Sequence, residues 1–72
     1  MNKEIDYLKK IGSSIKYYRS LRKVTQTELA KKINISQSYL SRIENGKVDY
    51  NICILWEICI ILEVKIYDLF PD

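Results

Sequence analysis

The chain has 72 residues, which is enough for one small domain and too few for two. Apolar residues make up 47% of it, with two Gly and one Pro, a composition that favours helices over turn-rich strands and predicts an all-α fold. The net charge of +3 is uneven, since residues 1 to 47 hold eleven Lys or Arg and four acids (+7), whereas residues 48 to 72 hold one Lys and five acids (−4). This division suggests a basic surface for a polyanion, although solvated charge of this kind can also serve solubility alone.

The features that the chain lacks bear on its class. The stretch MNKEIDYLKK is charged throughout and has no apolar core of a signal peptide, so we expect a cytoplasmic protein. The apolar run at residues 52 to 62 is about half as long as a membrane span, so no membrane association is expected. Cys53 and Cys59 do not have the spacing of a zinc site or a disulfide framework and are expected to be small buried hydrophobes. Without His, a Gly-rich phosphate loop or a Ser beside a base, the chain is expected to be neither an enzyme nor a cofactor-binding protein.

The first expected helix runs from about Asn2 to Leu21. Asn2 can act as its N-cap, and basic residues near its end suit the negative end of the helix dipole. Gly12 weakens the middle of this helix, so residues 1 to 10 are interpreted as an N-terminal helical extension. Apolar residues recur at steps of three or four and mark one buried face: Ile5, Leu8, Ile11, Ile15 and Tyr18.

Two short helices separated by a brief turn are predicted next. Thr25 followed three residues later by Glu28 is a capping box, which starts one helix at Thr25. Asn34 can take the left-handed conformation that ends this helix, and Ser36 then caps a second one that ends at Asn45. Two helices of about eight residues joined by three or four residues have the spacing of a helix-turn-helix.

The C-terminal part, residues 52 to 70, is expected to form a fourth and a fifth helix. Asn51 opens the fourth helix over the run ICILWEICIIL, and the short fifth helix stops before Pro71. The fourth helix carries apolar side chains on all its sides, whereas in a monomeric domain the side of such a helix that faces solvent is usually polar. A second buried surface on this helix is therefore expected. One arc of this helix is expected to face the core: Ile52, Leu55, Ile58, Cys59 and Leu62.

Residues 25 to 47 carry the most specific motif. The stretch TQTELAKKINISQSYLSRIENGK resembles the Cro/repressor-type helix-turn-helix domain of the XRE family, which includes lambda repressor-like phage proteins and restriction-modification controllers. The resemblance extends from about Ile11 to Phe70. It implies a single five-helix, lambda repressor-like domain over residues 1 to 72, with the helix-turn-helix at residues 25 to 45. It also implies a sequence-specific transcriptional regulator that binds double-stranded DNA and has no second domain to sense a small-molecule ligand.

The same resemblance implies which residues contact DNA. The helix over residues 37 to 45 would lie in the major groove, where Gln can pair with adenine and Arg with guanine. The base-reading residues would be Gln37, Ser38, Ser41 and Arg42. The DNA backbone would be held by Gln26, Tyr39, Asn45, Lys47, Lys16 and Arg22. Structural alternatives stay open: a helix-start role for Gln26, a solvated charge for Lys47, and an ion pair with Glu28 or Glu44 for Arg42.

The family pattern also assigns a structural role to Arg19 and Glu44, as a partly buried ion pair between the first and third helices. The chain departs from that pattern at four positions, none of which is expected to face DNA. Lys23 and Asn34 stand where Gly is common, Tyr50 where Pro is common, and Lys65 where a capping Ser is common.

Two hypotheses remain for the second apolar surface. In the first, it is the contact of a homodimer that binds a palindromic operator. The residues of this contact would be Cys53, Ile54, Ile60, Ile61, Ile66, Tyr67 and Phe70. In the second, the N-terminal extension folds back over part of the surface through Ile5 and Leu8. Since this fold also occurs in antitoxins and adaptors that bind other proteins, a protein-interaction module is the alternative function.

Overall fold

The computed structural model describes residues 3–70, with side chains described for residues 6–70, so the predicted cap at Asn2 and the side chain of Ile5 lie outside the described part. The elements, in chain order, are α1 (Lys3–Leu21), α2 (Gln26–Lys32), α3 (Gln37–Glu44), α4 (Ile52–Leu62) and η1 (Ile66–Leu69). The all-α prediction is confirmed.

The predicted fifth helix is wrong, because η1 is a short 3-10 helix. The backbone N–H of Lys65 donates to the carboxylate of Asp68 over 3.0 Å, which closes a tight turn. Phe70 is already extended, with φ −87° and ψ 139°. A residue before proline is pushed out of the helical region, and Pro71 follows Phe70, so the segment ends before α-helical hydrogen bonds can accumulate.

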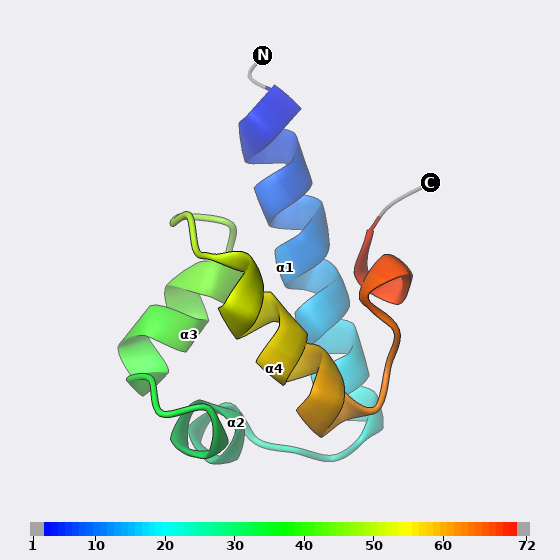
Figure 1. The fold of residues 1–72 in the computed structure, drawn as a ribbon. Helices are drawn as coiled ribbons and strands as arrows, with labels where there is room; N and C mark the ends of the chain where they lie inside the picture. The colour runs from blue at the N-terminus through cyan, green and yellow to red at the C-terminus, as the bar shows by residue number, and fades with distance from the viewer. Residues whose placement is uncertain (1–2, 71–72) are drawn as a thin grey trace.

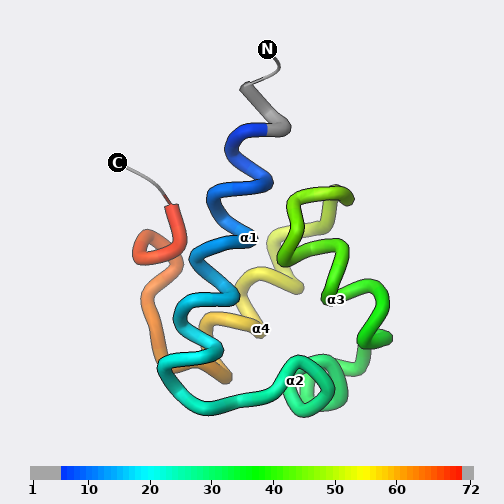
Figure 2. Tube along the Cα trace, turned by 180° about the vertical axis from the view of Figure 1, so that it is seen from behind, coloured from blue at the N-terminus to red at the C-terminus, as the bar shows by residue number. Residues whose placement is uncertain are grey.

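The helices pack around α1, which contacts α3, α4 and η1. Figure 1 shows α3 and η1 on opposite sides of α1, with α4 crossing in front and α2 closing the lower end. The view from behind in Figure 2 gives the same arrangement, with the long α1 nearest the viewer. Since α2 contacts α3 and α4, the two helices of the motif are held side by side at one edge of the domain.

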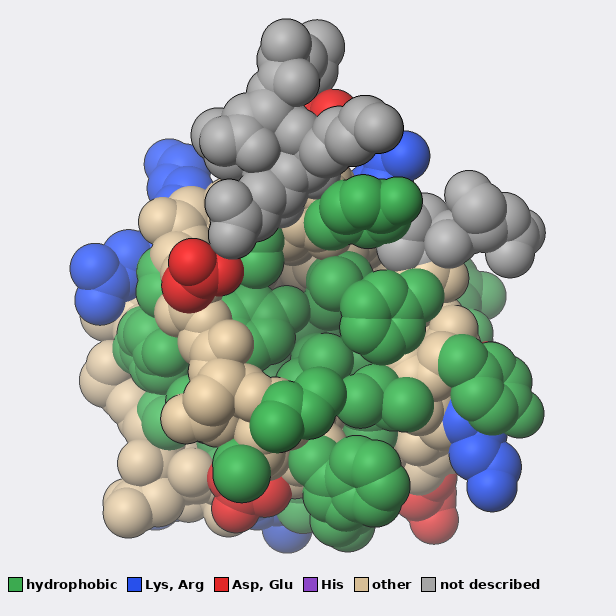
Figure 3. Space-filling view, turned by 45° about the horizontal axis from the view of Figure 1, so that its top comes forward, with side chains coloured by type: hydrophobic (Ala, Val, Ile, Leu, Met, Phe, Trp, Pro, Cys, Tyr) green, Lys and Arg blue, Asp and Glu red, His purple; other side chains and the backbone are tan. Residues whose placement is uncertain are grey.

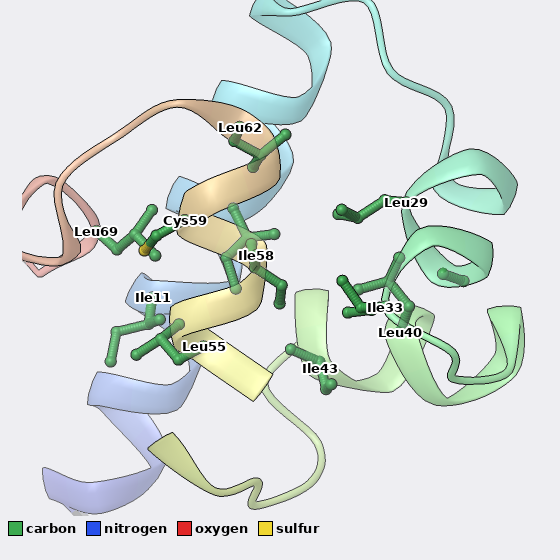
Figure 4. Close-up of a cluster of buried hydrophobic side chains, with 12 residues drawn as sticks. Ile11, Leu29, Ile33, Leu40, Ile43, Leu55, Ile58, Cys59, Leu62 and Leu69 are labelled. Atoms are coloured by element: carbon green, nitrogen blue, oxygen red, sulfur yellow. The ribbon is translucent and has the colours of Figure 1, made fainter. Parts of the chain in front are cut away.

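One apolar core joins these elements. Figure 4 shows the side chains of α4 between those of α2 and α3 on one side and those of α1 and η1 on the other. Ile58 is fully buried at this position. Burying one such side chain contributes about 1.5 to 3 kcal/mol. The buried apolar residues are Ile11, Ile15, Leu29, Ala30, Ile33, Leu40, Ile43, Leu55, Ile58, Cys59, Leu62 and Leu69.

The predicted helix caps at Thr25, Ser36 and Asn51 are confirmed. Thr25 Oγ1 accepts from the N–H of Glu28 over 3.1 Å, and the carboxylate of Glu28 accepts from the N–H of Thr25 over 2.9 Å. The backbone N–H of Thr25, and after it the Thr25 hydroxyl, stabilise the Glu28 carboxylate and hold its pKa below the ordinary value. Ser36 Oγ and Asn51 Oδ1 each accept from a backbone N–H three residues later, over 3.0 Å. The starts of α2, α3 and α4 are therefore fixed locally.

Three residues with side chains take left-handed backbone conformations: Lys23 (φ 57°), Asn34 (φ 59°) and Glu63 (φ 57°). Asn34 was predicted to do so, and it ends α2. Lys23 and Glu63 follow α1 and α4 in the same way, although residues other than Gly and Asn pay about 1 to 2 kcal/mol there. A Lys where Gly is common in the family therefore adds strain to this loop.

Gly12 does not interrupt α1, which is continuous from Lys3 to Leu21. Gly12 is buried, and a Cβ there would lie 2.5 Å from the carbonyl oxygen of Glu44 and 2.6 Å from that of Ile43. The missing side chain therefore lets α1 approach α3 closely. The N-terminal turns continue the same helix and leave Ile60 of α4 62% exposed, so they do not fold back over that residue.

The expected core arc of α4 is confirmed for Leu55, Ile58, Cys59 and Leu62, but not for Ile52, which is 60% exposed. Ile52 begins the helix and lies beyond the edge of the core. Cys53 in the same turn is exposed, so its assignment as a buried hydrophobe is also wrong. Cys59 is buried, and burial raises the pKa of its thiol. Among the described residues, no helix is both long and apolar enough to cross a membrane.

Tyr50, in the segment before α4, packs against the core. Its hydroxyl is buried and finds no hydrogen-bond partner among the described residues. Burial raises the pKa of Tyr50 to about 12. An unpaired buried hydroxyl costs about 1 to 3 kcal/mol, which is the energetic consequence of a Tyr at this position.

Candidate nucleic-acid interface

The outer side of α3 is polar and its inner side is apolar. Leu40 and Ile43 point into the core and are fully buried. The expected base-reading residues, at positions 37, 38, 41 and 42, lie on the opposite side of α3. Their spacing brings them together on one helical face. Gln37, Ser38 and Arg42 are exposed there, whereas Ser41 is partly buried.

Tyr39 orients Arg42 on this surface. The guanidinium carbon of Arg42 lies 6.0 Å from the centroid of the Tyr39 ring. The Tyr39 hydroxyl donates to the carbonyl oxygen of Asp49 over 3.4 Å, which anchors the ring to the segment before α4. A cation–π contact holds the guanidinium without using its N–H donors. Within the described residues, no ion pair joins Arg42 to Glu28 or Glu44, so the third alternative for Arg42 is not seen.

Gln26 and Gln37 are joined through their side-chain amides. Gln37 Nε2 donates to Gln26 Oε1 over 3.3 Å, and Gln26 Nε2 donates to Glu44 Oε1 over 3.1 Å. Gln26 at the start of α2 is therefore fixed at both ends of its amide, between the first and last turns of α3. This pairing, which depends on contacts between two helices, was not predicted from the sequence.

The expected ion pair between Arg19 and Glu44 is present. Arg19 Nε donates to Glu44 Oε2 over 2.7 Å and Nη2 donates to Oε1 over 3.1 Å, so the pair is bidentate. Arg19 Nη1 also donates to the carbonyl oxygen of Val24 over 3.1 Å. The Glu44 side chain is 0% exposed and that of Arg19 15% exposed. One buried carboxylate therefore joins α1 and α3, and through Gln26 also α2.

The loop after α3 begins with a side-chain cap. Asn45 Nδ2 donates to the carbonyl oxygen of Ser41 over 2.8 Å, and Gly46 turns the chain with φ 69°. Lys47 follows and is exposed, as is Lys16 on α1. Asn45 and Lys47 lie at the C-terminal end of α3, whereas Gln26 lies near its N-terminal end. The groups expected to hold the DNA backbone therefore include residues at both ends of α3.

Arg22, which is also expected to hold the DNA backbone, makes its hydrogen bonds at the end of α4. Its Nε donates to the carbonyl oxygen of Leu62 over 2.8 Å and its Nη2 to that of Glu63 over 3.2 Å. Both acceptors lie at the C-terminal end of α4, where the helix leaves carbonyl groups unsatisfied and a cation is favoured. Arg22 therefore caps α4 and ties it to the end of α1.

Comparison with known proteins identifies this arrangement of α2 and α3. Residues 15–69 match the helix-turn-helix family HTH_3. The chain belongs to this family. The HTH_3 domain has the lambda repressor-like all-α fold, and it is a DNA-binding domain of the transcriptional-regulator type rather than an enzyme.

Individual relatives support the same assignment. The uncharacterized HTH-type transcriptional regulator MJ0272 of Methanocaldococcus jannaschii is 40% identical over 58 residues, which cover 81% of this chain and 88% of that protein. The crystal structure of SinR, a master regulator for biofilm formation, in complex with DNA is 37% identical, covers 82% of this chain and 95% of that one, and has a TM-score of 0.74. The restriction-modification controller C.AhdI from Aeromonas hydrophila shares the fold, with a TM-score of 0.82. It is 22% identical, and the match covers 88% of this chain and 96% of that one.

A second surface of the HTH_3 domain is apolar and lies over α4 and η1. Figure 3 shows apolar side chains gathered across this side of the molecule. We call it the α4/η1 face and define it by its exposed residues Ile52, Cys53, Trp56, Ile60, Tyr67 and Phe70. A hollow of about 290 Å³ lies within it, lined by Trp56, Ile60 and Tyr67 among others.

The α4/η1 face overlaps only in part with the predicted dimer contact. Cys53, Ile60, Tyr67 and Phe70 are exposed on it as expected. Ile54, Ile61 and Ile66 are partly buried and pack against the core, so part of their apolar surface already serves the domain. The predicted dimer contact did not include Ile52, which was expected in the core, and it did not include Trp56.

Proposed function

We propose that the protein binds a palindromic operator in double-stranded DNA as a homodimer, with α3 of each copy in the major groove, and so regulates transcription. The observation that carries this proposal is the polar side of α3, where Gln37 and Arg42 are exposed and each is oriented by a neighbour. Oriented Gln and Arg side chains can make paired hydrogen bonds to adenine and guanine. The related SinR structure, which was solved with DNA, supports the same use of the fold.

The remaining contacts in this proposal go to phosphates. Gln26 approaches from the start of α2, and Asn45 and Lys47 from the loop after α3, so that α3 is held at both ends. Lys16 and Tyr39 add contacts beside it. Such contacts position the protein on DNA without reading its sequence, and they make binding depend on salt.

The proposed dimer forms through the α4/η1 face. Trp56 is 57% exposed and Tyr67 69% exposed, and large apolar residues gathered in this way usually mark a protein contact. This face belongs to the acidic part of the sequence, which would be repelled by DNA. Because one short recognition helix buries little surface, a second copy supplies affinity, and two-fold symmetry places the half-sites about 34 to 36 Å apart.

A protein-interaction module remains the alternative, and the hollow of about 290 Å³ in the α4/η1 face favours it. In that case an apolar segment of another protein would occupy the hollow. The two functions differ in whether the protein binds duplex DNA specifically, so one experiment separates them.

The deciding experiment is selection of binding sites from random duplexes, followed by titration of the selected duplex at several salt concentrations. We expect specific binding that weakens steeply with salt. Gln37→Ala and Arg42→Ala should each lower the affinity by about 10-fold or more at an unchanged melting temperature, since a bidentate base contact is worth about 1 to 3 kcal/mol. Lys10→Ala, which removes one positive charge from an exposed position on α1 that has no role in this proposal, is the matched control and should bind normally.

Absence of specific binding, or binding that is insensitive to salt and to both α3 variants, would contradict the regulator proposal. That result would favour the protein-interaction module. Equal losses in Arg42→Ala and Lys10→Ala would show that only total charge matters, which would remove Arg42 from the base-reading set.

A further inference from the structure

The N-terminal turns of α1 lie outside the part of the chain that matches the HTH_3 family, which begins at residue 15. They nevertheless form one continuous helix with the rest of α1. Figures 1 and 2 both show them rising beyond the loop that joins α3 to α4. This extension therefore lies near the end of α3 where Asn45 and Lys47 are expected to hold the DNA backbone.

Lys9 in this extension packs directly on the loop. A Cβ placed on Gly46 would lie 2.6 Å from Lys9 Cα and 2.6 Å from Lys9 Cγ. Only a residue without a side chain allows this approach, and the positive φ of Gly46 also favours Gly. The stem of Lys9 thus runs across the backbone between Asn45 and Lys47, while Lys9 as a whole is exposed.

The side of α1 that carries Lys9 faces α3. Gly12, three residues after Lys9, meets the carbonyl oxygens of Ile43 and Glu44, and Arg19 binds the Glu44 carboxylate. Asp6 is the acid one turn before Lys9, and no ion pair joins the two among the described residues. Lys9 therefore brings a positive charge to the flank of α3.

We propose that Lys9 is a further DNA-backbone contact, which acts with Asn45 and Lys47 on the same flank of the major groove. This inference rests on the proposed function. Because its stem is already packed on Gly46, Lys9 loses less side-chain freedom on binding a phosphate than a fully solvated lysine does. The extension would then widen the interface beyond the helix-turn-helix and add affinity that is independent of base sequence.

The test is the salt dependence of binding to the selected duplex by the full chain and two single variants. Lys9→Gln keeps a long stem that can pack on Gly46 and removes the charge. Lys10→Gln is the matched control, because it changes the net charge equally. At about 100° per residue, Lys10 lies about 160° around α1 from Gly12, so it points away from α3.

We expect Lys9→Gln to make the slope of log affinity against log salt shallower by about 1.8, because each of the two copies in the proposed homodimer loses one phosphate contact worth about 0.9. Binding should also weaken several-fold or more at low salt. Lys10→Gln should keep the slope of the unaltered protein, and Lys9→Arg should restore it. Equal slopes for Lys9→Gln and Lys10→Gln would overturn the inference.

A loss of melting temperature in Lys9→Gln with an unchanged slope would also overturn it, because Lys9 would then only support the loop. Failure of the unaltered protein to bind any duplex is a separate outcome that contradicts the proposed function itself. The two failures are therefore distinguishable in one set of titrations.

Discussion

At the residue scale, the buried carboxylate of Glu44 connects stability to the DNA-facing surface. It accepts two hydrogen bonds from Arg19 and one from Gln26, which in turn accepts from Gln37. A charge with no exposed surface must be compensated in this way, because its desolvation costs several kcal/mol. The same contacts that stabilise the junction of α1, α2 and α3 therefore also orient Gln37.

We predict that Arg19→Ala destabilises the domain by about 3 to 5 kcal/mol, since the variant leaves the Glu44 carboxylate buried without its main partner. Urea or thermal unfolding followed by circular dichroism measures this loss. Lys16→Ala, an exposed position one turn earlier on the same helix, should change stability by about 0.5 kcal/mol or less. A melting temperature in Arg19→Ala equal to that of Lys16→Ala would show that the pair contributes little to stability.

The residues that were predicted correctly depend mainly on local patterns. Thr25, Ser36 and Asn51 cap helices through backbone groups three residues away, so a short stretch of sequence contains both partners. Arg22 contrasts with them, because its acceptors are carbonyl groups 40 and 41 residues later. Its charge is evident in the sequence, but the carbonyl groups that it binds are brought to it by the packing of α4 on α1.

At the element scale, Gly12 shows that helix propensity and helix packing can act in opposite directions. Propensity alone gives an Ala an advantage of about 1 kcal/mol over Gly inside a helix. Here the absent side chain allows the backbone of α1 to approach the last turn of α3, where Ile43 and Glu44 present carbonyl oxygens. Those oxygens belong to the backbone and cannot turn aside, so packing should dominate.

We predict that Gly12→Ala lowers stability by about 1 to 3 kcal/mol, the usual cost of overpacking. Denaturant unfolding gives the sign directly. Ser13→Ala, at the exposed neighbouring position, is the control and should be neutral or slightly stabilising because only helix propensity changes there. A gain of stability in Gly12→Ala would mean that α1 and α3 can separate slightly at little cost.

The burial of residues along α4 was predicted only in part from their helical spacing. The helical spacing correctly placed Leu55, Ile58, Cys59 and Leu62 in the core, because each has neighbouring elements on its side of the helix. Ile52 has the same angular position, but it stands one turn beyond the edge of the packed layer and is exposed. A helical wheel shows the angle of a residue around the helix axis but not its position along that axis. The exposure of Ile52 could therefore be seen only in the tertiary structure.

At the scale of the whole molecule, the sequence division of charge corresponds to two surfaces with different tasks in the proposed function. The polar side of α3 and the loop after it come from the basic part of the chain, whereas the α4/η1 face comes from the acidic part. Phosphates would attract the first and be repelled by the second. A pair of domains joined through the α4/η1 face could therefore present both copies of α3 to one duplex.

We predict that the protein sediments as a dimer at micromolar concentration, at twice the 8.6 kDa of the chain. Ile60→Asp places a charge in the centre of the proposed contact and should give a monomer, because the interface would have to desolvate that charge. Leu21→Asp, at the exposed end of α1, lines neither this face nor its hollow and serves as the matched control.

The same variants should separate dimerisation from DNA recognition. Ile60→Asp should bind a palindromic duplex only about as tightly as a single half-site, because it loses the linked second contact, whereas Leu21→Asp should retain the full preference for the palindrome. If the unaltered protein sediments as a monomer and Ile60→Asp still prefers the palindrome, the two copies would meet only on DNA, through a surface other than the α4/η1 face. Binding by α3 would then stand, and the α4/η1 face would be left for a different protein partner.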